Sequence, residues 1–253
     1  ISIIDSLKEQ NPNLRVIGLS ATPYRLGTGY IYRQDEKRKA TGHDGYFLQR
    51  VYALPARYLI DKGYLTNPVV GAINSGHYET KDMQLNSMGK FTKDDIDKAY
   101  HGRGRLTSSI VADVVAQARD RQGVMFFAAT IQHAEEILES LPPELSAIVT
   151  GNTHKDERAL ILLAFKARRI KYLVNVEVLT TGFDAPHVDV IAILRATESV
   201  ALLQQIIGRG LRIADGKTDC LVLDYAENIE RHCPDWDIFN PEIEAAIKKK
   251  GDY

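Results

Sequence analysis

The segment SVALLQQIIGRGLR, residues 199–212, carries three polar side chains whose spacing could serve phosphate chemistry. Gln205, Arg209 and Arg212 stand at positions i, i+4 and i+7, so they share one face of a helix. Guanidinium groups are planar and permanently charged, and they can grip two oxygens of an anion at once. The pattern predicts either an anion site at a helix end or a capped helix end with two solvated arginines.

Polar residues also follow three other apolar segments. The loops are SATP at residues 20–23, TGNT at 150–153 and TTGFDAP at 180–186. If the preceding segments are parallel strands, their carboxyl ends share one edge of a sheet, and such sheets place ligands at that edge. We therefore expect these loops and the arginine helix to form a functional edge.

From residue 106 onward, helical and extended patterns alternate. Helical patterns cover residues 106–121, 131–140, 155–168 and the arginine segment, with Thr153 as the expected N-cap of the third. The apolar runs between and after them predict strands that start near Gly123, Ser146, Lys171, Val188 and Asp219. Continuous apolar strands separated by amphipathic helices predict an α/β fold with a parallel sheet covered on both faces.

The pattern before residue 106 is less regular. We expect a helix over residues 2–8, a buried strand over 14–19, and a helix over 54–62 that is closed by Gly63. Residues 27–45 are polar and Gly-rich, which predicts an exposed loop. Residues 63–68 are the candidate linker, a strand should begin at Val69, and residues 75–104 show no periodicity.

Composition restricts the class of protein. The chain has 253 residues, 44% hydrophobic and 26% charged, so it can bury a substantial core. Its formal net charge of -1 gives no global basic signal, so any polyanion site must be local. Cys220, Cys233 and His232 are too few for a disulfide framework or a zinc site. Because no run is long enough to span a membrane, we expect a cytoplasmic protein without a membrane partner.

Four segments, in this order and spacing, carry a family resemblance. GLSATPYR, TGNTHKDER, NVEVLTTGFDAP and QQIIGRGLR resemble motifs III, IVa, V and VI of superfamily 2 helicases. SATPYRLGTGYIYR, RYLIDKGYLT and LVLDYAENIERH further resemble the bacterial RadD (YejH) group of DNA-repair helicases. The resemblance implies a RecA-like, doubly wound parallel sheet at residues 66–253, the second helicase domain. It implies that residues 1–65 are the tail of a first RecA-like domain.

The resemblance implies a nucleotide site built around the arginine helix. Arg209 and Arg212 would be arginine fingers that stabilise the charge on the transferred phosphoryl group, and Gln205 would organise the cleft. Gly182 and Asp184 would bind the nucleotide, with Asp184 on the ribose. For Asp184, a turn fixed by the Asp-Ala-Pro sequence itself is the competing interpretation.

The resemblance also implies nucleic-acid contacts and a coupling loop. Thr150, Gly151, Thr153 and Arg158 would touch the nucleic-acid backbone, and Thr181 would lie between nucleotide and nucleic acid. Ser20, Ala21 and Thr22 would couple nucleotide state to the grip on nucleic acid. The competing interpretations are a simple helix cap at Thr153 and a local turn before Pro23. Lys155 stands where relatives often have glutamine, so no role is carried over to it.

Two expected parts of an ATPase site are missing from the sequence. No GxxxxGK[ST] pattern occurs, and no Asp-Glu pair follows an apolar strand before Ser20. ATP with Mg²⁺ would then be bound fully only with a first domain outside these residues. Because the chain starts at Ile1 and not at a methionine, we expect a piece of a longer protein. Because the phosphate-binding loop and the magnesium-binding carboxylates are missing, we expect this piece to be inactive alone.

The expected function of the parent is an ATP-dependent DNA helicase or translocase in DNA repair. DNA is the expected nucleic acid, and other repair proteins are the expected partners. Two alternatives stay open: the motor subunit of a restriction enzyme, and a non-catalytic RecA-like module that binds nucleic acid. A glycosyltransferase-like domain or another phosphate-binding α/β domain is disfavoured by the ordered set of four motifs.

Overall fold

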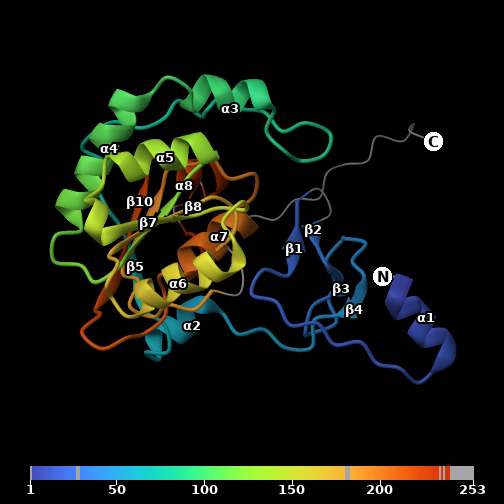
Figure 1. Ribbon diagram of the computed structural model, residues 1–253. Helices are drawn as coiled ribbons and strands as arrows, with labels where there is room; N and C mark the ends of the chain where they lie inside the picture. The colour runs from blue at the N-terminus through green and yellow to red at the C-terminus, as the bar shows by residue number, and fades with distance from the viewer. Residues whose placement is uncertain (1, 27–28, 180–182, 234, 236, 240–253) are drawn as a thin grey trace.

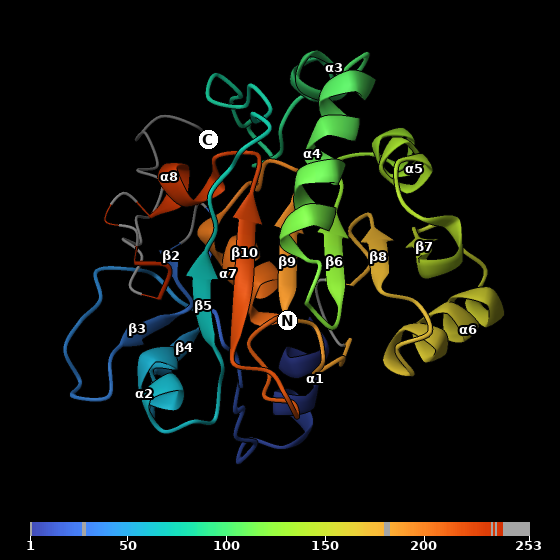
Figure 2. The ribbon, with the colours of Figure 1, turned by 90° about the vertical axis from the view of Figure 1, so that its left-hand side faces the viewer.

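The computed structural model describes residues 2–26, 29–179, 183–233, 235 and 237–239. Its centre is one parallel sheet of six strands in the order β5-β10-β9-β6-β8-β7 (Figure 2). The strands are β5 (Asn67–Val70), β6 (Val124–Phe127), β7 (Ser146–Val149), β8 (Tyr172–Asn175), β9 (Val190–Ile193) and β10 (Asp219–Asp224). The predicted α/β class and parallel sheet are confirmed.

Alternate residues of the central strand β6 enter two separate cores. Val124 and Phe126 belong to a core that includes residues of helices α4 (Gly104–Gln117) and α5 (Ile131–Glu139). Met125 and Phe127 belong to the other core, which includes residues of α6 (Lys155–Lys166), α7 (Val200–Gly208) and α8 (Asn228–His232). Because side chains alternate between the faces of a strand, helices cover both faces of the sheet.

The predicted helices of this part lie close to their expected bounds, but one cap is wrong. The N-cap of α6 is His154 and not Thr153, and its side chain makes no capping hydrogen bond. The hydroxyl of Thr153 instead accepts a hydrogen bond from Thr150 N at 2.9 Å. The hydroxyl closes the turn before the helix, so it is not available to cap the first turn of α6.

The predicted buried strand over residues 14–19 is also wrong. A short helix, α1 (Ser2–Gln10), precedes this segment as expected, but Ile17 and Leu19 are 85% and 97% exposed. A strand needs a neighbour to pair its backbone groups, and no described strand lies beside this segment. Apolar composition alone therefore did not produce a strand here.

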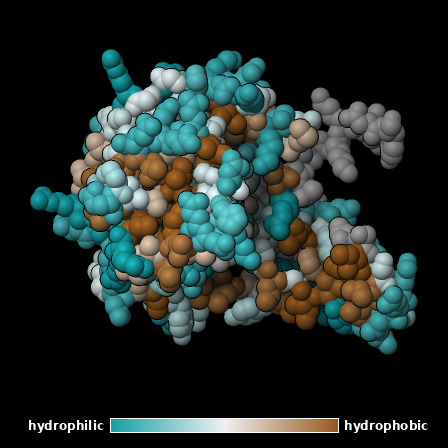
Figure 3. All heavy atoms as spheres, in the orientation of Figure 1, coloured by the Kyte–Doolittle hydropathy of each residue, from teal (hydrophilic) through white to brown (hydrophobic). Residues whose placement is uncertain are grey.

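Residues 27–45 are not simply an exposed loop. Strands β1 (Tyr24–Arg25) and β2 (Gly29–Tyr30) pair antiparallel, and β3 (Tyr32–Gln34) pairs in parallel with β4 (Phe47–Gln49). Tyr32 is buried, with the Arg50 guanidinium 5.0 Å from its ring centroid. One patch of exposed apolar surface lies beside this part of the chain, near α1 (Figure 3), and exposed apolar residues in and after β4 include Leu48, Val51 and Tyr52.

The stretch from residue 54 to 104 holds one expected helix and one that was missed. Helix α2 (Ala56–Asp61) ends before Gly63, whose φ of +73° suits glycine at a helix end, as predicted. Helix α3 (Lys93–Tyr100) lies in the segment predicted to lack periodicity, and Thr92 caps it by accepting a hydrogen bond from Asp95 N. A short 3₁₀ helix, η1, covers Pro143–Leu145.

The division into residues 1–65 and 66–253 stays a prediction. Among the described strands, β5 at Asn67 is the first in sequence to join the six-stranded sheet, and α1 and β1 to β4 lie to one side of that sheet (Figure 1). Within the described residues, no helix is long and apolar enough to cross a membrane.

Candidate functional site

Helix α7 is anchored to the sheet and stops where the arginines begin. Ser199 caps its start by accepting a hydrogen bond from Leu202 N, and Leu203, Ile206 and Ile207 are buried in the core. The helix ends at Gly208, and the N–H of its C-cap, Arg209, donates to Ile206 O. The anchored apolar stripe therefore fixes where the two arginines emerge.

Close packing explains why a glycine, Gly210, stands between the two arginines. A Cβ at this position would lie 2.2 Å from Cys220 Sγ and 2.9 Å from Ile191 Cγ1. The backbone therefore passes against β9 and β10 at a distance that only glycine permits. At Gly208 a Cβ would meet no atom within 4 Å. The two glycines of GRG thus differ, and only Gly210 is required by close packing.

Arg209 and Arg212 converge on the segment that follows β8. Both donate from Nη1 to the carbonyl oxygen of Phe183, at 2.7 Å and 3.0 Å. Arg212 Nη1 also lies 2.6 Å from Asp184 Oδ1, in an ion pair. The structure therefore brings together three of the predicted site residues. Gly182 and Thr181, also predicted for this site, lie outside the described residues.

The electrostatics of this cluster are unbalanced toward positive charge. Burial lowers the pKa of the Arg209 guanidinium, and the nearby Arg212 acts in the same direction, while Asp184 opposes them. A guanidinium stays charged in proteins in spite of such effects. Among the described residues, two cations therefore lie beside one carboxylate and one carbonyl oxygen.

Gln205 contacts the SATP loop from the beginning of the chain. Its Nε2 donates to Thr22 Oγ1 at 3.2 Å, and Thr22 is 4% exposed. The neighbouring Tyr24 hydroxyl donates to Gln204 Oε1. Ser20 Oγ accepts from Thr22 N at 3.1 Å, which is the local turn considered as the alternative, and Ala21 is exposed. The local turn at Ser20 and the contact between Thr22 and Gln205 of α7 are therefore both present.

The TGNT turn forms a second group of predicted residues at the end of β7. Arg158 Nη2 donates to Thr150 O at 2.8 Å and to Thr153 O at 3.3 Å, so this arginine braces the turn. Thr150 Oγ1 accepts from Asn152 N at 3.2 Å. Gly151 is exposed, and a Cβ there would meet no atom within 4 Å. Thr150, Thr153 and Arg158 are thus together, with Gly151 at the surface.

Sequence reasoning missed residues that hold the arginine segment. The backbone N–H of buried Thr66 donates to Leu211 O at 2.7 Å, and its hydroxyl donates to Arg212 O at 3.1 Å. Lys217 donates to the same Arg212 carbonyl at 2.6 Å. Contacts between a side chain and distant backbone carbonyls leave no periodic pattern in a sequence, so no signal pointed to either residue.

Arg195 was also missed, because its pairing with Glu177 depends on the folded path of the chain. Its guanidinium is buried and pairs with Glu177 at 3.1 Å and with Glu198 at 3.3 Å. Glu177 follows β8 and Glu198 directly precedes the N-cap of α7. These residues line a cleft of about 270 Å³ at the carboxyl edge of the sheet, together with Phe91.

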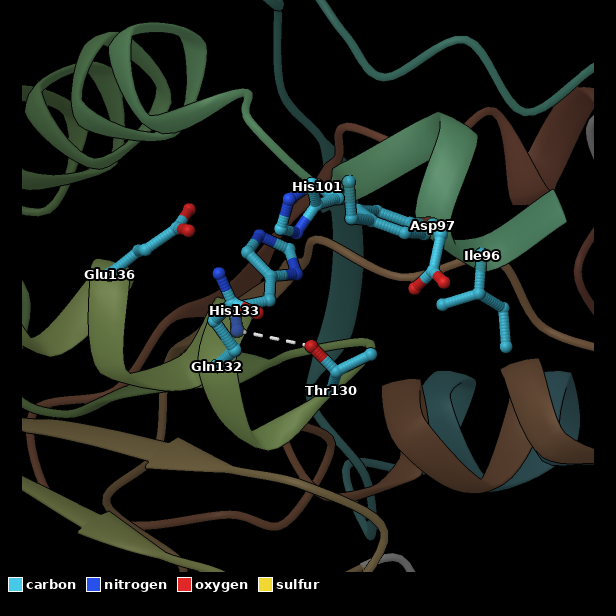
Figure 4. A pocket seen from close by; sticks show the side chains of 8 residues that line it. Ile96, Asp97, His101, Thr130, Gln132, His133 and Glu136 are labelled. Atoms are coloured by element: carbon cyan, nitrogen blue, oxygen red, sulfur yellow. Dashed lines mark hydrogen bonds between the residues drawn. The ribbon is translucent and has the colours of Figure 1, made fainter. Parts of the chain in front are cut away.

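A polar hollow lies between α3 and α5, away from the arginines in sequence. It measures about 20 Å³, enough for one water molecule, and is lined by Asp97, His101, Thr130, His133 and Glu136. In Figure 4, Asp97 and Glu136 lie on opposite sides of His133. The described part of the chain holds no group of three His, Cys, Asp or Glu residues placed to bind a metal ion.

Comparison with known proteins agrees with this geometry. Residues 107–214 match the family described as the helicase conserved C-terminal domain, a stretch that runs from α4 to just beyond Arg212. The chain is 29% identical over 227 residues to the "Putative mitochondrial ATP-dependent helicase irc3" of Schizosaccharomyces pombe, covering 88% of the chain and 35% of that protein. It is 32% identical over 238 residues to the UvrABC system protein B of Chlamydia trachomatis serovar D, covering 88% and 34%.

A solved structure shares the fold. The fragment of a "putative HsdR subunit of a type I restriction enzyme" from Vibrio vulnificus YJ016 superposes with a TM-score of 0.59 at 22% identity, over 79% of this chain and 39% of that one. The chain spans about a third of the length of each of the two sequence relatives, irc3 and UvrABC system protein B. The parallel sheet agrees with a RecA-like fold, and residues 107–214 match the helicase conserved C-terminal domain.

Proposed function

We propose that the chain is the second motor domain of an ATP-dependent superfamily 2 DNA helicase or translocase, and that its arginines act as fingers on the γ-phosphate. The observation that carries this proposal is the convergence of Arg209 and Arg212 on Phe183 O beside Asp184. Phosphoryl transfer spreads negative charge over the γ-phosphate oxygens, and a guanidinium from a second domain stabilises that charge.

The residues of the cluster fit part of a nucleotide. Arg209 is half-buried beside a second cation, so an incoming phosphate offsets both its lost hydration and its repulsion from Arg212. Asp184, whose side chain is 62% exposed, can accept hydrogen bonds from ribose hydroxyls. Within the described part of the cluster Asp184 is the one carboxylate, and it is paired to Arg212. The carboxylates for Mg²⁺ and the phosphate-binding loop therefore come, in this proposal, from a domain outside these residues.

The TGNT turn is proposed to contact the nucleic-acid backbone. The hydroxyls of Thr150 and Thr153 accept hydrogen bonds inside the turn, so their protons remain to donate to a phosphate oxygen. Such contacts position a protein on the backbone without reading the base sequence. The resemblance to the RadD group favours DNA over RNA, and DNA repair in the cytoplasm as the process, with other repair proteins as partners.

The test uses the full-length protein that carries these residues, in an assay of ATP hydrolysis stimulated by single-stranded DNA. Arg209→Ala and Arg212→Ala are expected to lower kcat by about a thousandfold, the scale of an arginine finger, with DNA binding retained. The exposed Arg169→Ala is the matched control and should leave kcat unchanged. Full ATPase activity of the two finger variants would overturn the proposal, and loss of DNA binding with ATPase retained would favour the non-catalytic module.

A second assay addresses the missing half of the site. The 253-residue chain alone is expected to show no ATP hydrolysis with single-stranded DNA, because the phosphate-binding loop is not in its sequence. Robust turnover by this chain would contradict that expectation. The restriction-enzyme alternative, which shares the fold of the HsdR fragment, predicts DNA cleavage by the full-length protein in the presence of ATP. Absence of cleavage alongside DNA-stimulated ATPase would favour the helicase.

A further inference from the structure

The ammonium group of Lys217 is surrounded by four backbone carbonyls. Its Nζ lies 2.6 Å from the carbonyl oxygens of Val188, Gly210 and Arg212, and 3.2 Å from that of Pro186. An ammonium has three N–H donors, so four acceptors use its full capacity and share one proton. A surface lysine normally donates to water, so this arrangement points to a specific structural task.

The four carbonyls belong to two segments that carry the predicted site. Pro186 and Val188 follow Phe183 and Asp184 in the loop after β8, and Gly210 and Arg212 belong to the arginine segment. The arginines already meet the first segment at their tips, through Phe183 O. Lys217 joins the same two segments through their backbone carbonyls. The two segments are therefore linked both by the arginine side chains and by Lys217.

The strength of the link between the two segments depends on the positive charge of the Lys217 ammonium group. Burial lowers the pKa of Lys217, because removing an ammonium from water disfavours the charged form. Hydrogen bonds from a charged donor are about twice as strong as neutral ones, and Lys217 makes three of them at 2.6 Å. A neutral side chain of the same length would leave buried carbonyl oxygens without these donors, which costs stability and order.

We propose that Lys217 is a positioning residue that holds the backbone of Arg209–Arg212 against the Phe183–Asp184 loop, so that both guanidinium groups point at the bound nucleotide. This inference rests on the proposed nucleotide site. Lys217 itself touches no reacting group, and acts through the two segments it joins. Misplacing a catalytic group by about 1 Å costs on the order of a hundredfold in rate.

The test compares two half-buried lysines in the full-length protein. Lys171 Nζ also donates to two backbone carbonyls, of Ala118 and Arg119, but these belong to neither the arginine segment nor the Phe183–Asp184 loop. Lys217→Met is expected to lower the kcat of DNA-stimulated ATP hydrolysis about 10- to 100-fold, with little change in the KM for ATP. Lys171→Met is expected to lower thermal stability but leave kcat within about twofold, because Lys171 does not contact either of the two segments that Lys217 joins.

A rescue experiment separates positioning from general stability. Lys217→Ala leaves space for a small ammonium ion, so millimolar ethylammonium is expected to restore part of kcat in this variant and none in Lys171→Ala. An unchanged kcat in Lys217→Met, or equal losses in both methionine variants, would overturn the proposal. If Arg209→Ala and Arg212→Ala also kept full activity, the proposed function itself would be refuted. If those two variants lost activity while Lys217→Met kept it, only the proposed role of Lys217 would be refuted.

Discussion

Asp184 and Arg212 form an ion pair with 2.6 Å between Oδ1 and Nη1, although 28 positions separate them in the chain. The residue predicted to hold the ribose thus touches a residue predicted to hold the phosphate. Their side chains are 62% and 37% exposed, and exposed ion pairs contribute about 0 to 1 kcal/mol to stability. The pair therefore adds little to the stability of the fold.

Replacing the carboxylate separates these two contributions. Asp184→Asn keeps the shape of the side chain and removes its charge, so the free energy of unfolding is expected to change by less than about 1 kcal/mol. In the full-length protein the KM for ATP is expected to rise about tenfold with kcat changed less, because a ribose contact is made equally in the ground and transition states. Steady-state kinetics checks this split. A fall in kcat at constant KM would contradict the ribose assignment.

The two glycines of GRG predict opposite effects of alanine. Gly210→Ala forces a methyl group into Cys220 and Ile191, and such overpacking typically costs about 1–3 kcal/mol. Gly208→Ala is the matched control, since it adds a methyl group in open space at the end of α7. There alanine is favoured over glycine by up to about 1 kcal/mol in helices. Urea unfolding of the chain measures both. Equal stability of the two variants would show that the close approach at Gly210 is not limiting.

The sheet was predictable because its signal is local. Runs such as VMFF and YLVN are buried on both faces, so nearly every residue in them is apolar, with Asn175 as the exception, and the helices between them carry their own periodicity. The segment over residues 14–19 has the same composition but no described neighbour, and it formed no strand. Helix α3 was missed because its apolar stripe is short: Ile96, Ala99 and Tyr100, at i, i+3 and i+4, span little more than one turn.

The candidate site was predictable only where its chemistry needs particular residue types. Arginines and an aspartate in a fixed order are visible in the sequence, and the structure joins Arg209, Arg212 and Asp184. Lys217 and Thr66 act through carbonyls of distant residues, and any residue offers a carbonyl. Their roles depend on the folded path of the chain, which the local pattern does not encode.

Thr22 offers a test of coupling between the SATP loop and the arginine helix. Thr22→Val keeps the buried volume but removes the oxygen that accepts from Gln205 Nε2 at 3.2 Å. One hydrogen bond contributes about 1 kcal/mol, so the stimulation of ATPase by DNA is expected to fall about fivefold while basal ATPase is retained. Thr41→Val, whose hydroxyl donates to Tyr32 O in the N-terminal part, is the control. Unchanged stimulation in Thr22→Val would remove the coupling role from this contact.

His133 lies at the centre of a buried hydrogen-bond chain that makes stability depend on pH. Ala129 N donates to its Nδ1 at 3.3 Å, so the proton resides on Nε2, which donates to the Tyr78 hydroxyl at 2.9 Å. The Tyr78 hydroxyl in turn lies 3.0 Å from Thr107 Oγ1. A second proton on the imidazole would face the Ala129 N–H. Burial lowers the pKa of His133 to about 4, and the hydrogen bond from Ala129 N likewise favours the neutral imidazole over the protonated one.

The sign of the pH dependence follows from this shift. The unfolded chain binds a proton at His133 near pH 6.5, whereas the folded chain does so only near pH 4. Stability from this residue is therefore present above about pH 6.5 and is lost as the pH falls toward 4, by about 3 kcal/mol in total. His133→Gln is expected to flatten the fall of unfolding free energy over this range, and the exposed His154→Gln is the control. If His133→Gln and the unaltered chain showed the same slope, the acid sensitivity would be assigned to other groups. Burial also lowers the pKa values of His187 and His232, so these two residues would be the next to test.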